Sequence, residues 1–123
     1  MTHKTLIAIV DDDESIRETT KDLIESAGLR AATFASAEAY LASGQLPAVA
    51  CIVADMRMGG MSGLSLYQHL AASGRAVPTI LMTAYPEEPV RARALTAGVS
   101  AYIVKPFTDD ELLGCIGFAA GTA

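Results

Sequence analysis

The sequence predicts an α/β fold of the doubly wound class, built on one five-stranded parallel sheet. Three observations support this prediction. Five short apolar runs recur along the chain, and continuous runs of this length are typical of strands that are covered on both faces. Stretches with apolar residues at helical spacing follow these runs. Several of those stretches end at a glycine, the residue that most often follows a helix.

The five predicted strands are short. They are residues 5–10, 29–34, 48–54, 78–83 and 100–104. The run at 48–54 should be the most buried, whereas the run at 29–34 is weaker and should lie at an edge of the sheet. The predicted strand order is 2-1-3-4-5, which makes the first and third strands neighbours.

The predicted helices carry start and stop signals. In the first, Ile16 and Ile24 lie at helical spacing, Asp13 is expected to cap the start, and Gly28 supplies the stop. The later helices are a short one capped by Ser36 and running through Leu41, one ended by Gly74, one at 90–97 closed by Gly98 with Pro89 in its first turn, and a last one opened by a capping box of Thr108 and Glu111.

Composition and charge narrow the class of protein. A chain of 123 residues, of which 51% are hydrophobic and 19% charged, is long enough for one domain with a real core. The net charge of -5 argues against binding to a nucleic-acid backbone. No segment resembles a signal peptide or a membrane span, and Cys51 and Cys115 lack metal or disulfide spacing, so they are expected to be reduced thiols. The expected location is the cytoplasm.

Chemically active side chains follow four of the five predicted strands. Asp11 and Asp12 follow the first, Asp55 the third, Thr83 ends the fourth and Lys105 follows the fifth. Open α/β sheets build their sites at these carboxyl ends. Because neighbouring strands lie about 4.8 Å apart, the acid pair should face Asp55 directly, and the side chain of Lys105 can close most of a gap of roughly 10 Å.

Three carboxylates this close to one another repel, and a divalent cation is the simplest remedy. Mg²⁺ prefers oxygen ligands and often combines one or two carboxylates with a phosphate. With the cation present, Asp55 can act as a nucleophile toward phosphorus and form an aspartyl phosphate. No base is needed beside it, because a carboxylate is already deprotonated. Thr83 and Lys105 could each hold one phosphoryl oxygen.

Over essentially its whole length the chain resembles the receiver domains of response regulators. The stretches that carry the resemblance are "IVDDDESIR", the Asp of "VADMRMGGMSG", "ILMTA" and "AGVSAYIVKPF", and "FASAEAYL" at 34–41 is similar to the FixJ-type branch. The resemblance implies a flavodoxin-like receiver fold and a cis bond before Pro106. It assigns the site residues as follows: Asp12 as direct ligand of Mg²⁺ (or Mn²⁺) with the backbone carbonyl of Arg57 and with Asp11 assisting, Asp55 as phosphoacceptor, Thr83 and Lys105 as phosphoryl contacts, and Thr83 and Tyr102 as the switch pair.

The same resemblance implies a signalling switch instead of a conventional enzyme. Residues 1–123 are expected to form a single receiver domain without an output domain, and the domain would take part in its own phosphorylation and dephosphorylation. The implied donor is a sensor histidine kinase or a phosphotransfer protein. The implied recipient of the signal is a downstream protein or a covalently linked output domain, acting through a changed surface of the fourth helix, fifth strand and fifth helix. A phosphorylation-dependent dimer is compatible with this scheme, whereas binding of nucleic acid or membrane by this domain is not expected.

Two alternatives stay open at this point. A phosphatase of the haloacid-dehalogenase type also uses a nucleophilic Asp, but that Asp is followed two residues later by an acid, and here this position is Arg57. A receiver-like interaction module that is not phosphorylated is the second. The chain also departs from the family at Gly59, where proline is common, and the glycine should loosen the loop by about 0.4–1 kcal/mol.

Overall fold

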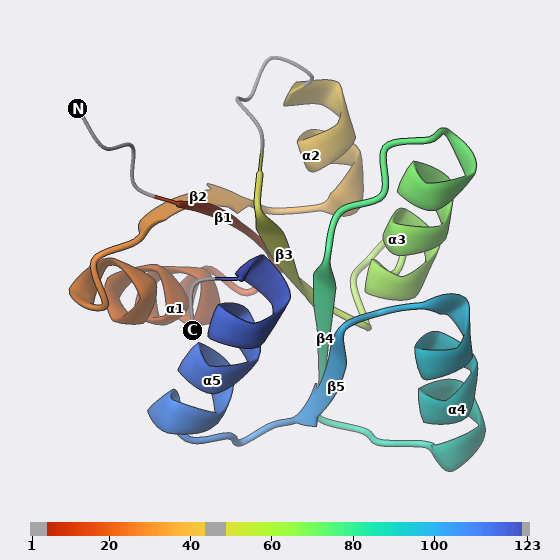
Figure 1. The fold of residues 1–123 in the computed structure, drawn as a ribbon. Coiled ribbons are helices and arrows are strands. Elements are labelled where there is room, and N and C mark those ends of the chain that lie inside the picture. Colours follow the sequence, from red (N-terminus) through yellow and green to blue (C-terminus); the bar gives the residue numbers. More distant parts are fainter. Residues whose placement is uncertain (1–4, 44–48, 122–123) are drawn as a thin grey trace.

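Five strands alternate with five helices in the computed structural model, which describes residues 5–43 and 49–121 (Figure 1). Their bounds are β1 Leu6–Val10, α1 Glu14–Ser26, β2 Arg30–Phe34, α2 Ala37–Ser43, β3 Cys51–Asp55, α3 Gly63–Ala72, β4 Thr79–Thr83, α4 Glu88–Ala97, β5 Ala101–Val104 and α5 Asp109–Ala120. The predicted alternation of strands and helices is confirmed.

The strands form one parallel sheet in the order β2-β1-β3-β4-β5, as predicted. Val10 pairs with Ala54, and Asp55 pairs with Met82, so β1, β3 and β4 end nearly level with one another. The expected edge position of β2 is also confirmed, since this strand is partly exposed along its length. The register therefore brings the residues after β1 and at the end of β3 to the same edge of the sheet.

Helices cover both faces of the sheet, which explains the continuous apolar runs (Figure 1). On one face, Ile7, Ile9 and other strand residues pack against Ile24 of α1 and Ile116 of α5. On the other face, the alternate strand residues pack against α2, α3 and α4, with Leu66 fully buried. Every residue of β1, β3 and β4 is buried. The third strand was expected to be the most buried, and β1 and β4 are buried as completely.

Most helix ends lie where the sequence places them. Asp13 caps α1 by accepting a hydrogen bond from the backbone N–H of Ile16 at 3.1 Å. Thr108 and Glu111 form both hydrogen bonds of the capping box of α5. At the end of α4, Gly98 adopts a φ of 113°, a left-handed conformation that favours glycine.

Several boundaries differ from the prediction, and strands β1, β2, β4 and β5 each begin one residue later than expected. Helix α4 begins at Glu88, two residues before the predicted bound at position 90, and Pro89 lies in its first turn as expected. Helix α2 extends beyond Leu41 to Ser43. Strand β3 begins at Cys51 and includes Asp55, whereas the predicted strand was 48–54, and position 48 lies outside the described residues.

Two further expectations are met. Cys51 and Cys115 are free thiols, and burial raises the pKa of the Cys51 thiol to about 12. The bond between Lys105 and Pro106 is cis. Within the part of the chain that the structure describes, no helix is long and apolar enough to cross a bilayer.

Candidate functional site

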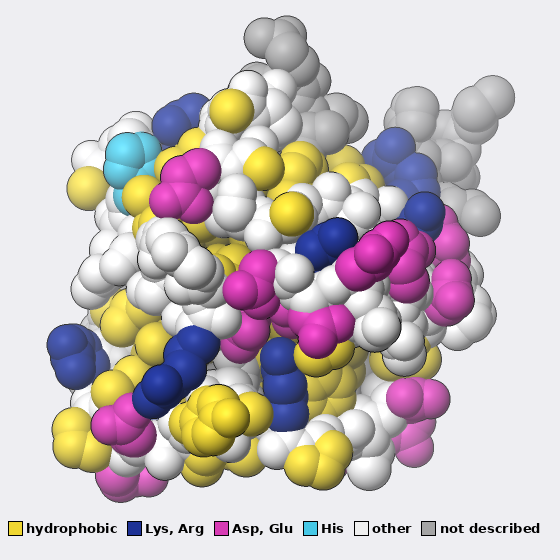
Figure 2. Space-filling model, turned by 180° about the vertical axis from the view of Figure 1, so that it is seen from behind, with side chains coloured by type: hydrophobic (Ala, Val, Ile, Leu, Met, Phe, Trp, Pro, Cys, Tyr) yellow, Lys and Arg dark blue, Asp and Glu magenta, His cyan; other side chains and the backbone are white. Residues whose placement is uncertain are grey.

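The parallel register of β1 and β3 brings Asp11 and Asp55 to the same edge of the sheet. Asp55 is the last residue of β3, and Asp11 directly follows β1, where its backbone N–H donates to the carbonyl of Phe34 at 3.1 Å. Asp11 is fully buried, Asp12 is exposed, and Asp55 is nearly buried. The space-filling view shows acidic side chains gathered near the middle of one face, with basic side chains beside them (Figure 2).

The three carboxylates predicted to hold a metal ion do come together. Asp11, Asp12 and Asp55 each offer an oxygen, and these oxygens lie within 4.8 Å of one another. The donor set is made of carboxylate oxygens, the kind of ligand that Mg²⁺ prefers over Zn²⁺ or copper. The residues present therefore fit a Mg²⁺ ion, and Asp11, Asp12 and Asp55 would be its side-chain ligands.

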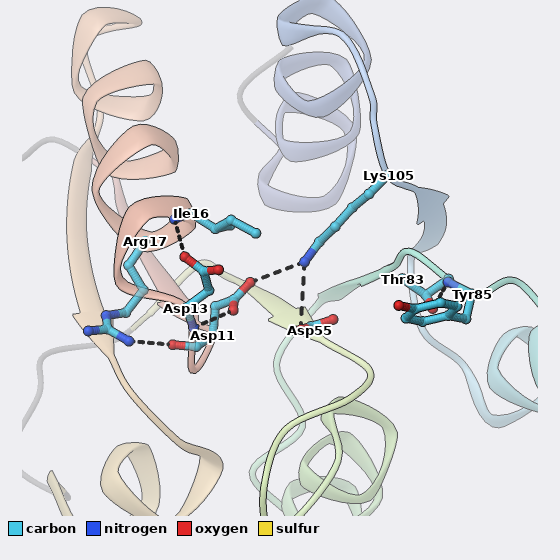
Figure 3. A network of polar contacts seen from close by, with 8 residues as sticks. All are labelled: Asp11, Asp13, Ile16, Arg17, Asp55, Thr83, Tyr85 and Lys105. Atoms are coloured by element: carbon cyan, nitrogen blue, oxygen red, sulfur yellow. Dashed lines mark hydrogen bonds and ion pairs between the residues drawn. The ribbon is translucent and has the colours of Figure 1, made fainter.

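Asp11 is held in place by its immediate neighbours (Figure 3). Its Oδ1 accepts a hydrogen bond from the backbone N–H of Asp13 at 2.9 Å, and its carbonyl accepts one from the guanidinium of Arg17 at 2.8 Å. Because Asp13 is itself the cap of α1, the start of that helix fixes the turn that carries the acid pair. The other Oδ atom of Asp11 is left to face Asp55 and Lys105.

The side chain of Lys105 spans the distance to the acidic residues, as the sequence predicts. Its side chain extends from the end of β5 across the sheet edge (Figure 3), and Nζ lies 3.4 Å from Oδ2 of Asp11 and 3.6 Å from Oδ2 of Asp55. The side chain is 17% exposed, so water screens these charges less than on the open surface. Lys105 is therefore a counter-ion for two buried carboxylates.

The pKa of Asp55 is raised from its ordinary value of 3.8. Burial is the largest cause, and the charges of Asp11 and Asp12 act in the same direction, whereas Lys105 and the backbone N–H of Arg57 lower the pKa. The sequence predicts mutual repulsion of the three carboxylates. The structure makes repulsion the lesser contribution and burial the greater one.

Thr83 lies one strand further along the same edge and is almost fully buried. Its Oγ1 accepts a hydrogen bond from the backbone N–H of Tyr85 at 3.0 Å. This contact uses the oxygen of Thr83 as an acceptor and leaves its hydroxyl hydrogen able to donate. Tyr102 is partly buried and packs on the face of the sheet that α4 covers.

Three contacts at the rim of the site were missed by sequence reasoning. The guanidinium of Arg57 pairs with Glu87 at 3.0 Å and lies 5.0 Å from the ring centre of Tyr85. Glu38 of α2 accepts a hydrogen bond from the backbone N–H of Met61 at 3.0 Å. All three contacts join the loop after Asp55 to a distant part of the chain, and although Glu38 lies in the "FASAEAYL" stretch, no pattern in the sequence predicts the contacts themselves.

The sequence matches the family of response regulator receiver domains over residues 7–116. The chain belongs to this family. It is 40% identical over 114 residues to the response regulator protein TmoT of Ectopseudomonas mendocina, in an alignment that covers 92% of this chain and 51% of TmoT. It is 35% identical over 115 residues to the transcriptional regulatory protein FixJ of Azorhizobium caulinodans, with 94% of this chain and 54% of FixJ covered.

Solved structures agree with this assignment. The crystal structure of FixJ-N has a TM-score of 0.87 at 29% sequence identity, with 99% of this chain and 98% of that one covered. The response regulator StyR also has a TM-score of 0.87, at 36% identity, with 98% of this chain and 61% of the StyR chain covered. The chain spans about half the length of the curated relatives it matches.

This receiver domain is thus a phosphorylation-dependent switch of the two-component type and not a conventional enzyme. The family assignment does not favour a haloacid-dehalogenase-type phosphatase or an unphosphorylated interaction module. The resemblance stated from the four sequence stretches is confirmed at the level of family and fold.

Proposed function

We propose that Asp55 is the phosphoacceptor of this receiver domain and that it takes its phosphoryl group from a phosphohistidine of a sensor kinase or of a phosphotransfer protein. The observation that carries the proposal is the convergence of Asp11, Asp12, Asp55 and Lys105 at one sheet edge. A lone carboxylate at the end of a strand has many structural explanations. A nearly buried carboxylate that faces two more acids and an ammonium is better explained as a phosphoryl-transfer site.

The proposed step is an in-line displacement at phosphorus. An oxygen of Asp55 forms a bond to phosphorus while the bond from phosphorus to the donor's imidazole nitrogen breaks, and the leaving imidazole keeps the electron pair and takes up a proton. Mg²⁺, when bound by the three carboxylates and the carbonyl of Arg57, would neutralise charge on the phosphoryl oxygens. Lys105, whose Nζ already lies 3.6 Å from Asp55, supplies a second positive charge beside the same group.

Phosphate uptake and loss both involve this site. Reversal by water would break the bond from phosphorus to the Asp55 oxygen and return a free carboxylate. In this sense the domain takes part in its own phosphorylation and dephosphorylation.

The signal would leave through Thr83 and Tyr102. A phosphoryl group on Asp55 offers new acceptor oxygens, and Thr83 has a hydroxyl hydrogen to donate to them. Moving that hydroxyl gives up its bond to Tyr85, so the loop before α4 must respond. Tyr102 lies on the α4 side of the sheet and could turn into the space that is vacated, which makes a bistable element that the phosphate biases.

The surface of α4, β5 and α5 is the proposed place of output. Each of these elements carries a large exposed hydrophobic side chain, namely Leu95, Val104 and Phe118. A downstream protein, a linked output domain or a second copy of the domain would bind within residues 85–118, away from α1 and α2. TmoT and FixJ are about twice as long as the matched segment, which is compatible with a linked output domain.

Intact mass after incubation with Mg²⁺ and acetyl phosphate tests the phosphoacceptor. The parent protein should gain one phosphoryl group, and Asp55→Asn should gain none while keeping its fold, because an amide has the shape of the carboxylate but is not nucleophilic. A phosphoryl group on an aspartate of Asp55→Asn would show that the acceptor is misassigned.

Backbone chemical shifts with and without beryllofluoride test the switch. Shifts should change at Tyr102 and along α4, and Thr83→Ala should abolish these distant changes without preventing phosphorylation of Asp55. Changes confined to the loops around Asp12 and Asp55 would refute this route of signalling.

A further inference from the structure

The loop between Asp55 and α3 is the least supported part of the proposed metal site. It carries Arg57, whose carbonyl would be a metal ligand, and it then passes through the adjacent glycines Gly59 and Gly60. Two glycines give the backbone wide freedom. The side chain of Arg57 contacts Glu87 and Tyr85, but the glycine part of the loop needs a contact of its own to hold it in place.

The contact comes from the first turn of α2. Oε2 of Glu38 accepts a hydrogen bond from the backbone N–H of Met61 at 3.0 Å, across 23 residues of sequence. Among the described residues, this is the one hydrogen bond between residues 58–61 and another element. The same bond is the largest of the causes that lower the pKa of Glu38.

Gly60 shows how closely the loop follows this carboxylate. A Cβ atom built on Gly60 would lie 2.6 Å from Oε2 of Glu38, closer than such atoms approach one another. At the neighbouring Gly59, a Cβ would meet nothing within 4 Å. A side chain at Gly60 would therefore push the flexible end of Glu38 away from the loop, whereas one at Gly59 would meet nothing.

Helix α2 is a firm base for Glu38. The backbone N–H of Ala39 donates to Oγ of Ser36 at 3.0 Å, and the preceding Ala37 is fully buried. The ring of Tyr40 meets Phe34 of β2 edge to face, with ring centres 5.1 Å apart. These contacts tie the helix to the sheet, so the position of Glu38 is set independently of the loop that it holds.

We propose that Glu38 is a positioning residue for the metal end of the phosphorylation site. By holding Met61 and the glycine pair against α2, it fixes the path of the loop and hence the direction of the Arg57 carbonyl. The proposal rests on the proposed function, because it assumes that Asp55 and its neighbours bind Mg²⁺. Residues that orient metal ligands typically change metal affinity when they are replaced.

Three variants and one control test this role. Glu38→Ala removes the hydrogen-bond acceptor, and Glu38→Gln keeps an acceptor without the charge. Gly60→Ala leaves Glu38 in place but adds a methyl group to the loop, which pushes the Glu38 carboxylate away. Glu25→Ala, at an exposed acid of α1 on the other face of the sheet, makes the same change of net charge as Glu38→Ala. The measurements are the Mg²⁺ dissociation constant and the amide chemical shifts of Arg57 and Met61.

Glu38→Ala and Gly60→Ala should weaken Mg²⁺ binding by about threefold to tenfold and shift both amides before any metal is added. Glu38→Gln and Glu25→Ala should bind Mg²⁺ nearly as the parent does. If Glu38→Ala binds Mg²⁺ as tightly as Glu25→Ala, or if Glu38→Gln behaves like Glu38→Ala, the positioning role is wrong. A parent protein that binds no Mg²⁺ would instead overturn the proposed function, and the role of Glu38 with it.

Discussion

Replacing Asp55 by Asn should stabilise the metal-free protein, although it removes an ion pair. With an effective dielectric constant of about 20, the 3.6 Å contact with Lys105 is worth about 5 kcal/mol of attraction. Repulsion from Asp11, whose carboxylate oxygen lies within 4.8 Å, is at least about 3.5 kcal/mol on the same scale. The two charge effects nearly cancel, and Asp12 adds further repulsion, so the cost of burying the carboxylate decides the sign. We expect Asp55→Asn to gain about 1–2 kcal/mol in the free energy of unfolding near neutral pH.

The pH dependence of this difference follows from the raised pKa of Asp55. Because the folded pKa lies above the unfolded value, the folded state holds the proton more tightly, and the stability from this proton is fully present below the unfolded pKa. It is lost as the pH rises through the folded pKa of Asp55. The extra stability of Asp55→Asn over the parent should therefore be near zero below pH 3.8, the ordinary pKa of Asp55. It should be largest at pH values above the folded pKa.

Urea unfolding in EDTA, repeated over this pH range, measures the difference. Asp22→Asn, at an exposed acid on α1, is the matched control for the change in net charge and should leave stability nearly unchanged. In millimolar Mg²⁺ the order should reverse, because the parent gains binding energy through a ligand that Asp55→Asn has lost. An Asp55→Asn protein that is less stable than the parent in EDTA near neutral pH would refute the reasoning, since attraction to Lys105 would then outweigh burial.

Lys105→Met should destabilise the metal-free protein by about 3 kcal/mol near neutral pH, because it leaves two buried carboxylates without a counter-ion. Urea unfolding measures this loss of stability, and a loss that Mg²⁺ does not partly restore would contradict the role of Lys105 as counter-ion. Gly98→Ala should lower the free energy of unfolding by about 1–2 kcal/mol, since φ is 113° and the new Cβ would lie 2.6 Å from a tyrosine hydroxyl. Gly114→Ala, in open space on α5, should raise it by about 0.5–1 kcal/mol. Equal thermal shifts of the two variants would contradict the different roles of these glycines. Thr108→Ala should lose about 1 kcal/mol in thermal unfolding with the capping box of α5, and an unchanged midpoint would show that the cap is redundant.

Local signals in the sequence were enough to predict the layout of the fold. Continuous apolar runs identified strands covered on both faces, and the capping residues Asp13 and Thr108 marked helix starts that the structure confirms. Boundaries were less certain where two rules compete. Pro89 can either precede a helix or occupy its first turn, and in the folded protein α4 begins at Glu88 and includes it.

The centre of the site was predictable for a topological reason. In a parallel sheet the carboxyl ends of neighbouring strands meet at one edge, so Asp11, Asp55 and Lys105 had to converge once the strands and their order were recognised. The balance of forces on Asp55 was not predictable. The sequence shows that three acids are close, whereas the degree of burial, which raises the pKa most, depends on how the packed elements exclude water.

The contacts at the rim could not be predicted, because each joins two segments whose geometry no periodicity defines. Glu38 of α2 accepts a hydrogen bond from Met61 in the glycine-containing loop after β3, and Arg57 of the same loop pairs with Glu87 just before α4. A glycine-rich loop allows many backbone paths of similar energy, so a single exposed carboxylate can select among them without a pattern in the sequence. The path of this loop is therefore seen in the folded protein and not in its sequence.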